Sequence, residues 1–230
     1  FPGVKTLRID SDSTRKKETL NEYFDEIRKG KPMILLGTQL LAKGHHFPNV
    51  TLVGIVDADS GLFSADFRGS ERVAQLMTQV SGRAGRDKKQ GRVILQSYCT
   101  DHPQIEEIIS GSYERFAQKI LEERKISNIP PFSFQAKIFA ESPKSLVSRD
   151  FILNLLNRSR IDERTRKNVR LVGPLPSIME KKSGVYRWEL SIFSKSRSNL
   201  HKFLDVMQSR LYDPKLSKQV RWSIDVDPLS

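Results

Sequence analysis

The sequence has little cysteine and no long apolar run, and these absences exclude several classes of protein. Cys99 is the one cysteine among 230 residues, so neither an internal disulfide nor a cysteine-rich metal cluster can form within the chain. No run of about 18 apolar residues occurs, which argues against a membrane-spanning helix. The chain opens on Phe1 without a signal peptide or a methionine. We therefore expect a fragment or a processed chain from a reducing compartment.

Positive charge is in excess, and most of the excess lies in the second part of the chain. Lysine and arginine number 39 against 27 acidic residues, a net charge of +12. Residues 1–128 contain 20 basic and 17 acidic residues, whereas residues 129–230 contain 19 and 10. A basic balance of this size favours a polyanionic partner, nucleic acid first and an acidic membrane surface second.

The sequence divides at Ile129-Pro130-Pro131, because two consecutive prolines cannot continue a helix. Before this point, short apolar runs alternate with amphipathic stretches, the pattern of a parallel α/β sheet. The expected helices cover residues 12–30, 70–80 and 105–124, and the expected strands cover 33–36, 52–56 and 93–95. We therefore predict an α/β fold with a parallel sheet for residues 1–128.

Residues 129–230 have the pattern of a small α+β domain. Strands are expected at residues 136–140, 169–172, 186–193 and 220–226, and helices at 146–156 and 200–211. The apolar residues of the second of these helices fall on one face. Two helices on one face of a small sheet are the architecture that this pattern predicts.

The most informative segment runs from Gln79 to Arg86 and reads Q-V-S-G-R-A-G-R. Its glycines allow close backbone approach. Arg83 and Arg86 carry fixed charges that can fork onto phosphate oxygens. Such cations stabilise the charge that develops on a γ-phosphate during phosphoryl transfer. A solvated basic turn is the alternative for an isolated Gly-Arg pair, but the full octet is far more specific.

A second segment, residues 37–48, follows the expected strand 33–36 and reads G-T-Q-L-L-A-K-G-H-H-F-P. Ligands of open α/β sheets bind at the carboxyl ends of the strands. Thr38 and Gln39 offer polar side chains, Lys43 offers a cation, and Gly44 leaves the backbone open. This combination suits contact with a nucleic-acid backbone. Lys43 is not a phosphate-loop lysine, because the sequence contains no G-x-x-x-x-G-K-[ST].

Three pairs of polar residues are weaker candidates. Asp57 and Asp59 follow the strand 52–56 and could hold a metal or a water, but a turn with satisfied side chains is the commoner arrangement. Asp25-Glu26 lies on a charged helix face and is interpreted as solvent-exposed. His45-His46 has no carboxylate or cysteine at ligand spacing. The sequence therefore predicts no metal site.

A basic and aromatic stretch, K-K-S-G-V-Y-R-W at residues 181–188, is the best binding candidate in the second part. Cations beside aromatic rings combine phosphate contact with base stacking. Lys181, Lys182 and Arg187 are the stronger candidates. For Tyr186 and Trp188, one buried face of an ordinary strand is an equally good interpretation.

Several of these segments resemble the motifs of superfamily 2 helicases. The octet 79–86 is similar to motif VI, and residues 37–48 are similar to motif V. With D-A-D, F-S-A-D-F-R, I-P-P-F and D-V-D-P at residues 57–59, 63–68, 129–132 and 225–228, the whole chain resembles bacterial ATP-dependent helicases that restart stalled replication forks. The resemblance implies most of the second RecA-like helicase lobe in residues 1–128, and the family's C-terminal DNA- and protein-binding domain in residues 129–230.

The resemblance also implies residue roles. Arg83 and Arg86 would reach a nucleotide bound on the other lobe, and Gln79 would face the same cleft. The residues implied to line or couple that cleft are Gly37, Thr38, Gln39, Asp57 and Asp59. The residues assigned to DNA are Lys43, Gly44, Lys181, Lys182, Tyr186 and Arg187. Arg197 is assigned to the acidic tail of single-stranded DNA-binding protein, although His201, one turn later, departs from the glutamine of the family pattern.

The family's first helicase lobe, which holds ATP and Mg²⁺, and its zinc-binding cysteine cluster have no counterpart in this sequence. We therefore expect no ATP hydrolysis by the chain alone and no zinc in it. The implied partners are forked and single-stranded DNA, single-stranded DNA-binding protein and other primosome proteins, with no membrane. The implied location is the bacterial cytoplasm, near the nucleoid. A non-catalytic DNA- and protein-binding module is the alternative.

Overall fold

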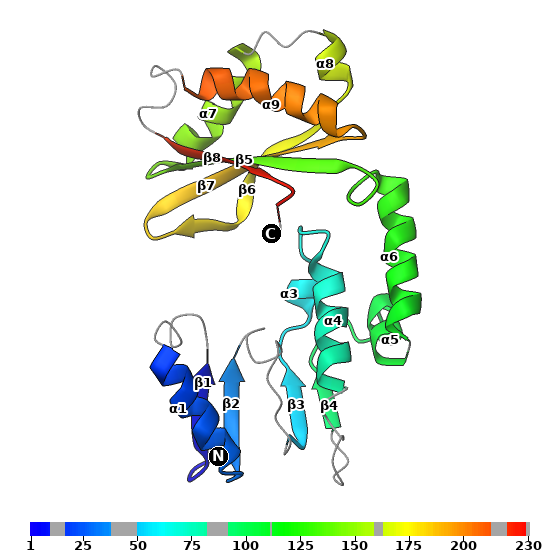
Figure 1. The fold of residues 1–230 in the computed structure, drawn as a ribbon, viewed down its shortest axis with the longest axis vertical. Coiled ribbons are helices and arrows are strands. Elements are labelled where there is room, and N and C mark those ends of the chain that lie inside the picture. Colours follow the sequence, from blue (N-terminus) through cyan, green and yellow to red (C-terminus); the bar gives the residue numbers. More distant parts are fainter. Residues whose placement is uncertain are drawn as a thin grey trace. The chain divides into compact units, whose positions relative to one another are not determined.

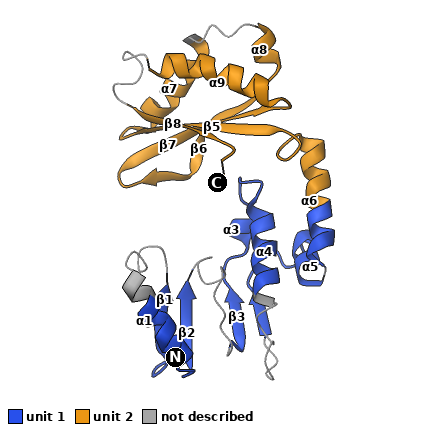
Figure 2. Ribbon diagram, viewed as in Figure 1, with its two compact units in different colours: residues 1–118 blue, residues 119–230 orange. Residues whose placement is uncertain are grey.

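The structure is a computed structural model that describes residues 1–9, 17–37, 50–81, 92–110, 112–158, 163–212 and 220–228 (Figure 1). The chain forms two compact units, residues 1–118 and 119–230 (Figure 2). Each unit has its own cluster of buried apolar side chains. The division falls within helix α6 (Tyr113–Ser127), which is followed by the turn at Pro130-Pro131.

The first unit contains two pairs of parallel strands. β1 (Lys5–Ile9) pairs with β2 (Met33–Gly37), and α1 (Lys17–Arg28) connects them. β3 (Leu52–Ile55) pairs with β4 (Arg92–Leu95), and the connection includes α3 (Asp59–Leu62) and α4 (Gly69–Ser81). Parallel strands require such crossover connections, which helices usually supply. The predicted parallel α/β fold is confirmed.

The buried cluster of the first unit is small and lies around α3 and α4. Among the residues that the structure describes, the buried members of this cluster are Ala58, Leu62, Val73 and Ile105. The two helices meet at Gly61 and Gly69. A Cβ at Gly69 would lie 2.2 Å from the carbonyl oxygen of Gly61, so this approach requires glycine.

The second unit is a four-stranded antiparallel sheet with helices on one face. β5 (Phe134–Ser142), α7 (Ser145–Arg158) and α8 (Glu163–Lys167) come first. β6 (Arg170–Lys182), β7 (Val185–Ser194), α9 (Arg197–Leu211) and β8 (Arg221–Val226) follow. The strand order is β6-β7-β5-β8, the ferredoxin-like arrangement of a βαββαβ chain. Both α7 and α9 contact β5 and β7 (Figure 1), which confirms the predicted α+β domain.

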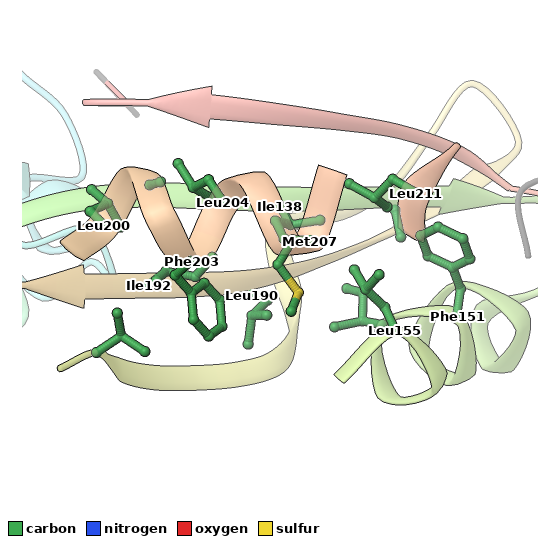
Figure 3. Close-up of a cluster of buried hydrophobic side chains, with 14 of the residues drawn as sticks. Ile138, Phe151, Leu155, Leu190, Ile192, Leu200, Phe203, Leu204, Met207 and Leu211 are labelled. Carbon is green, nitrogen blue, oxygen red and sulfur yellow. The ribbon is translucent and has the colours of Figure 1, made fainter. Parts of the chain in front are cut away.

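The core of the second unit lies between the sheet and these two helices (Figure 3). Alternate residues of β5 and β7 face the helices, because side chains alternate along a strand. The buried strand residues are Ala136, Ile138, Ala140, Leu190 and Ile192, and the buried helix residues include Phe151, Leu155, Leu200, Phe203, Leu204, Met207 and Leu211.

The structure differs from the predicted elements in several places. β1, α3 and α8 were not predicted. The expected helix 105–124 is two helices, α5 (Pro103–Ser110) and α6, because Ser112 begins the second one by accepting a hydrogen bond from the Arg115 amide at 3.3 Å. The expected strand 169–172 continues to Lys182, past Pro174 and Pro176. β6 tolerates these prolines because it lies at the edge of the sheet.

Candidate nucleotide and nucleic-acid sites

The motif VI octet begins in the last turn of α4. Gln79 is exposed there, and the helix ends at Ser81. The helix is held by its buried face and by an ion pair at its start, in which Arg72 lies 2.9 Å from Asp66. Arg83 and Arg86 lie outside the described residues, so their predicted role stays a prediction.

The motif V segment begins at the carboxyl end of β2. Gly37 is the last residue of this strand, is exposed, and pairs with Ile9 of β1. The other predicted residues of this segment lie outside the described residues: Thr38, Gln39, Lys43 and Gly44. The structure therefore positions only the start of motif V, at the edge where parallel sheets bind ligands.

Asp57 and Asp59 both accept hydrogen bonds from neighbouring groups. Asp57 has a positive φ of 55° and accepts from the amide and the hydroxyl of Ser60. The Asp59 carboxylate accepts from the Ser97 hydroxyl at 2.6 Å and from the Tyr98 amide at 2.8 Å. These two hydrogen bonds lower the pKa of Asp59, and the bond from the Ser97 hydroxyl contributes most.

The hydrogen bonds of Asp59 join the segments that follow β3 and β4. The Ala58 amide also donates to the Gln96 carbonyl at 3.0 Å across the same two segments. These hydrogen bonds therefore hold together the segments that follow the carboxyl ends of β3 and β4. The arrangement agrees with a satisfied turn, and the part of Asp57 and Asp59 in a nucleotide cleft stays a prediction.

The acidic pair in α1 takes part in surface ion pairs. Glu26 lies 2.9 Å from Lys5 of β1 and 2.6 Å from Lys29. The two lysines, with Lys29 contributing most, lower the pKa of Glu26 to about 2. Asp25 pairs with Arg28 at 3.0 Å. Among the described residues, no three His, Cys, Asp or Glu side chains gather as metal ligands.

The two lysines assigned to DNA lie at the end of the β6–β7 hairpin. Ser183 and Gly184 form its two-residue turn, with positive φ values of 50° and 84°. This is the backbone of a type I′ turn, whose twist matches that of the strands. The Lys181 ammonium lies 4.8 Å from the centre of the Tyr186 ring, a cation–π contact. Lys182 is exposed.

Arg187 and Trp188 follow Tyr186 in β7, and their side chains contact different groups. Arg187 donates from Nε to the Glu141 carboxylate at 2.8 Å. Trp188 packs against the core and donates from Nε1 to the Ser145 hydroxyl at 2.9 Å. Phosphate contact by Arg187 would therefore compete with Glu141. Glu141 was not predicted, because the register of β5 against β7 pairs it with Arg187.

Arg197 lies at the first position of α9. Ser196 caps this helix by accepting a hydrogen bond from the Asn199 amide. The Arg197 guanidinium lies 3.5 Å from Asp227 and 5.0 Å from the centre of the Phe134 ring, and its side chain is 64% exposed. It is therefore accessible to an acidic partner. Asp227 and Phe134 were not predicted, because strand pairing brings them here from distant parts of the sequence.

Two protein families match successive parts of the chain. The Helicase conserved C-terminal domain matches residues 2–88, and the Primosomal protein N C-terminal domain matches residues 125–229. No described helix is long and apolar enough to cross a bilayer.

Several relatives align with nearly the whole chain. Replication restart protein PriA of Haemophilus influenzae is 44% identical over 229 residues, which are 99% of this chain and 31% of that protein. The protein of that name in Rickettsia conorii is 36% identical over 100% of this chain and 34% of its own length. The Bacillus subtilis protein is 34% identical over 99% and 28%. The chain thus spans about a third of the length of these relatives.

Proposed function

Because the chain belongs to the PriA family of replication restart proteins, we propose that it is part of an ATP-dependent 3′→5′ DNA helicase. This enzyme would recognise stalled replication forks and restart replication by primosome assembly. One observation carries the proposal: a helicase region and a primosomal C-terminal region follow each other in the chain, and relatives named for replication restart align with 99–100% of it.

In this proposal the first unit supplies half of a nucleotide site. ATP and Mg²⁺ are held mainly by another lobe of the longer protein. Arg83 and Arg86 stabilise the charge that develops on the γ-phosphate, and Gln79 at the end of α4 faces the same cleft. Gly37, Thr38 and Gln39 with Asp57 and Asp59 couple this cleft to DNA held by Lys43 and Gly44. A cleft that ATP closes and hydrolysis opens can move one lobe along a strand.

The chain alone hydrolyses no ATP in this proposal, because it contains no phosphate-loop sequence. Zinc, when present, is bound elsewhere in the longer protein. The location that fits replication restart is the bacterial cytoplasm, near the nucleoid.

The arginine assignment is tested in the longer protein. Arg83→Ala or Arg86→Ala is expected to lower ATP turnover by about 10³–10⁵-fold, the contribution of an arginine finger, while DNA binding is largely kept. Lys88→Ala, which removes a cation two positions after the octet, is the matched control and should keep ATP turnover. Unchanged turnover in both arginine variants would contradict the assignment.

The second unit binds DNA in this proposal, through Lys181 and Lys182 with Tyr186 and Arg187. Fluorescence anisotropy of the 230-residue chain with single-stranded, duplex and forked DNA across a salt series tests it. We expect the tightest binding to forked DNA, with affinity falling steeply as salt rises. Lys181→Ala/Lys182→Ala should reduce the salt slope by about 2, whereas Lys195→Ala, directly after the other end of β7, should leave it unchanged.

Arg197 is proposed to bind the acidic tail of single-stranded DNA-binding protein. Its exposed guanidinium and its long 3.5 Å separation from Asp227 support this role. Arg197→Ala should weaken binding of a tail peptide, and Lys202→Ala, an exposed cation on the same helix, should not. Equal peptide affinity of wild type and Arg197→Ala would exclude the contact.

The absence of a phosphate-loop sequence favours a second candidate, a non-catalytic DNA- and protein-binding module. The two candidates differ in one measurement. A longer protein that binds forked DNA but shows no ATP turnover sensitive to Arg83 or Arg86 would support the module.

A further inference from the structure

The β6–β7 hairpin contains a large irregularity in strand pairing, a β-bulge of several residues, next to its turn. Pro176 of β6 pairs with Trp188 of β7, and Lys181 pairs with Tyr186. Four residues of β6, 177–180, therefore lie opposite the single residue Arg187. A bulge interrupts the ladder and redirects side chains, and bulges are often found beside functional sites.

The bulge inverts the usual placement of polar and apolar side chains. Ser177 is only 7% exposed, and its hydroxyl has no hydrogen-bond partner within the described part of the chain. Ile178 and Met179, by contrast, are 67% and 54% exposed. Burying an unpaired hydroxyl while exposing two large apolar side chains costs stability. Departures of this kind are expected at functional sites.

Glu180 follows the apolar pair, and two cations come next in the sequence. Lys181 and Lys182 lie between the bulge and the turn, and no described carboxylate forms an ion pair with either. Both ammonium groups are therefore available to an anionic partner. Their combination with Ile178 and Met179 favours a partner that presents phosphates beside an apolar, planar interior.

We propose that Ile178 and Met179 form a wedge that inserts between stacked bases of branched DNA, while Lys181 and Lys182 contact the flanking phosphates. Isoleucine and methionine side chains inserted at base steps unstack and kink DNA in other proteins. The base pair beside a branch is the natural target, because one of its faces lacks a continuous stack. The inference rests on the proposed function and assigns the second unit an active part in opening the DNA.

A fluorescent adenine analogue in the base pair next to the branch tests the wedge, because its emission rises when it unstacks. The 230-residue chain is added to saturation to this forked DNA and to the matching single strand. The wild-type chain should raise the emission of the forked DNA. Ile178→Ser/Met179→Ser should remove about half of the rise or more and weaken forked-DNA binding about fivefold, with single-strand affinity kept within about twofold.

Two further variants separate the wedge from general effects. Ile126→Ser on α6 removes an apolar side chain that is 82% exposed, and it should behave as wild type. Lys181→Ala/Lys182→Ala should weaken binding to both DNAs but keep the emission rise at saturation. Equal thermal unfolding of all variants will show that the fold is intact.

The outcomes distinguish the wedge from the proposed function. If the chain binds forked DNA but Ile178→Ser/Met179→Ser keeps the full emission rise, the wedge is refuted while DNA binding stands, and a protein partner becomes the better occupant of this surface. If the chain binds none of the DNAs, DNA binding by the second unit is refuted, and the wedge with it.

Discussion

The backbone approach of α3 and α4 at Gly61 and Gly69 leads to a quantitative prediction. In Gly69→Ala the new Cβ would lie 2.2 Å from the Gly61 oxygen and 2.8 Å from the Ser64 Cβ, where ordinary contact begins at 3.4 Å. A backbone oxygen cannot rotate away, so the helices must separate by about 1 Å. Overpacking of this kind costs about 2–3 kcal/mol, and the better helix propensity of alanine offsets about 1 kcal/mol of this. We expect a net loss of about 1–2 kcal/mol.

Unfolding in urea can locate this loss in the first unit. Trp188 and Trp222, the two tryptophans of the chain, both lie in the second unit, so tryptophan fluorescence follows that unit alone. Far-ultraviolet circular dichroism follows both. Gly69→Ala should move part of the dichroism transition to lower urea by about 1 M, for a slope of about 1–2 kcal/mol/M, and should leave the fluorescence transition in place.

Gly54→Ala is the matched control, because a Cβ at Gly54 meets no atom within 4 Å. It should leave both transitions unchanged. A dichroism transition that does not move in Gly69→Ala would refute the steric argument. Equal movement of both signals would instead show that the two units unfold together.

Three further predictions concern single side chains. Because the pKa of Asp59 is lowered by the Ser97 hydroxyl and the Tyr98 amide, its carboxylate stabilises the first unit at neutral pH, and this stabilisation is lost as pH falls through the lowered pKa. Asp59→Asn should remove that acid dependence in a dichroism titration. Phe203→Ala, at a fully buried site, should destabilise the second unit by about 3–5 kcal/mol in urea. Ser196→Ala should cost about 1 kcal/mol, because it removes the cap of α9.

The elements of the second unit could be predicted well, because the apolar residues of its core recur at regular spacing in the sequence. Ala136, Ile138 and Ala140 alternate along β5, and the apolar residues of α9 recur at helical spacing. Each pattern alone indicates the element and its buried face. The long extension of β6 was missed, because prolines and a bulge interrupt its alternation.

The first unit was harder to predict. β1 has only Leu7 and Ile9 as large apolar residues, and its strand character depends on pairing with β2. The site contacts depend on tertiary structure in the same way. Asp59 and its partner Ser97 are separated by 38 positions, and the partner of Arg187 follows from the register of two strands. The motifs could be found in the sequence because each is contiguous.

The pairing of β5 with β8 brings the start and the end of the ferredoxin-like fold together. Ala136 pairs with Val226, and the Asp227 amide donates to the Gln135 carbonyl at 2.9 Å. A domain whose two ends are neighbours can be excised, circularly permuted or inserted into another protein with little disturbance of its core. This fold can therefore be moved from one protein to another as one piece.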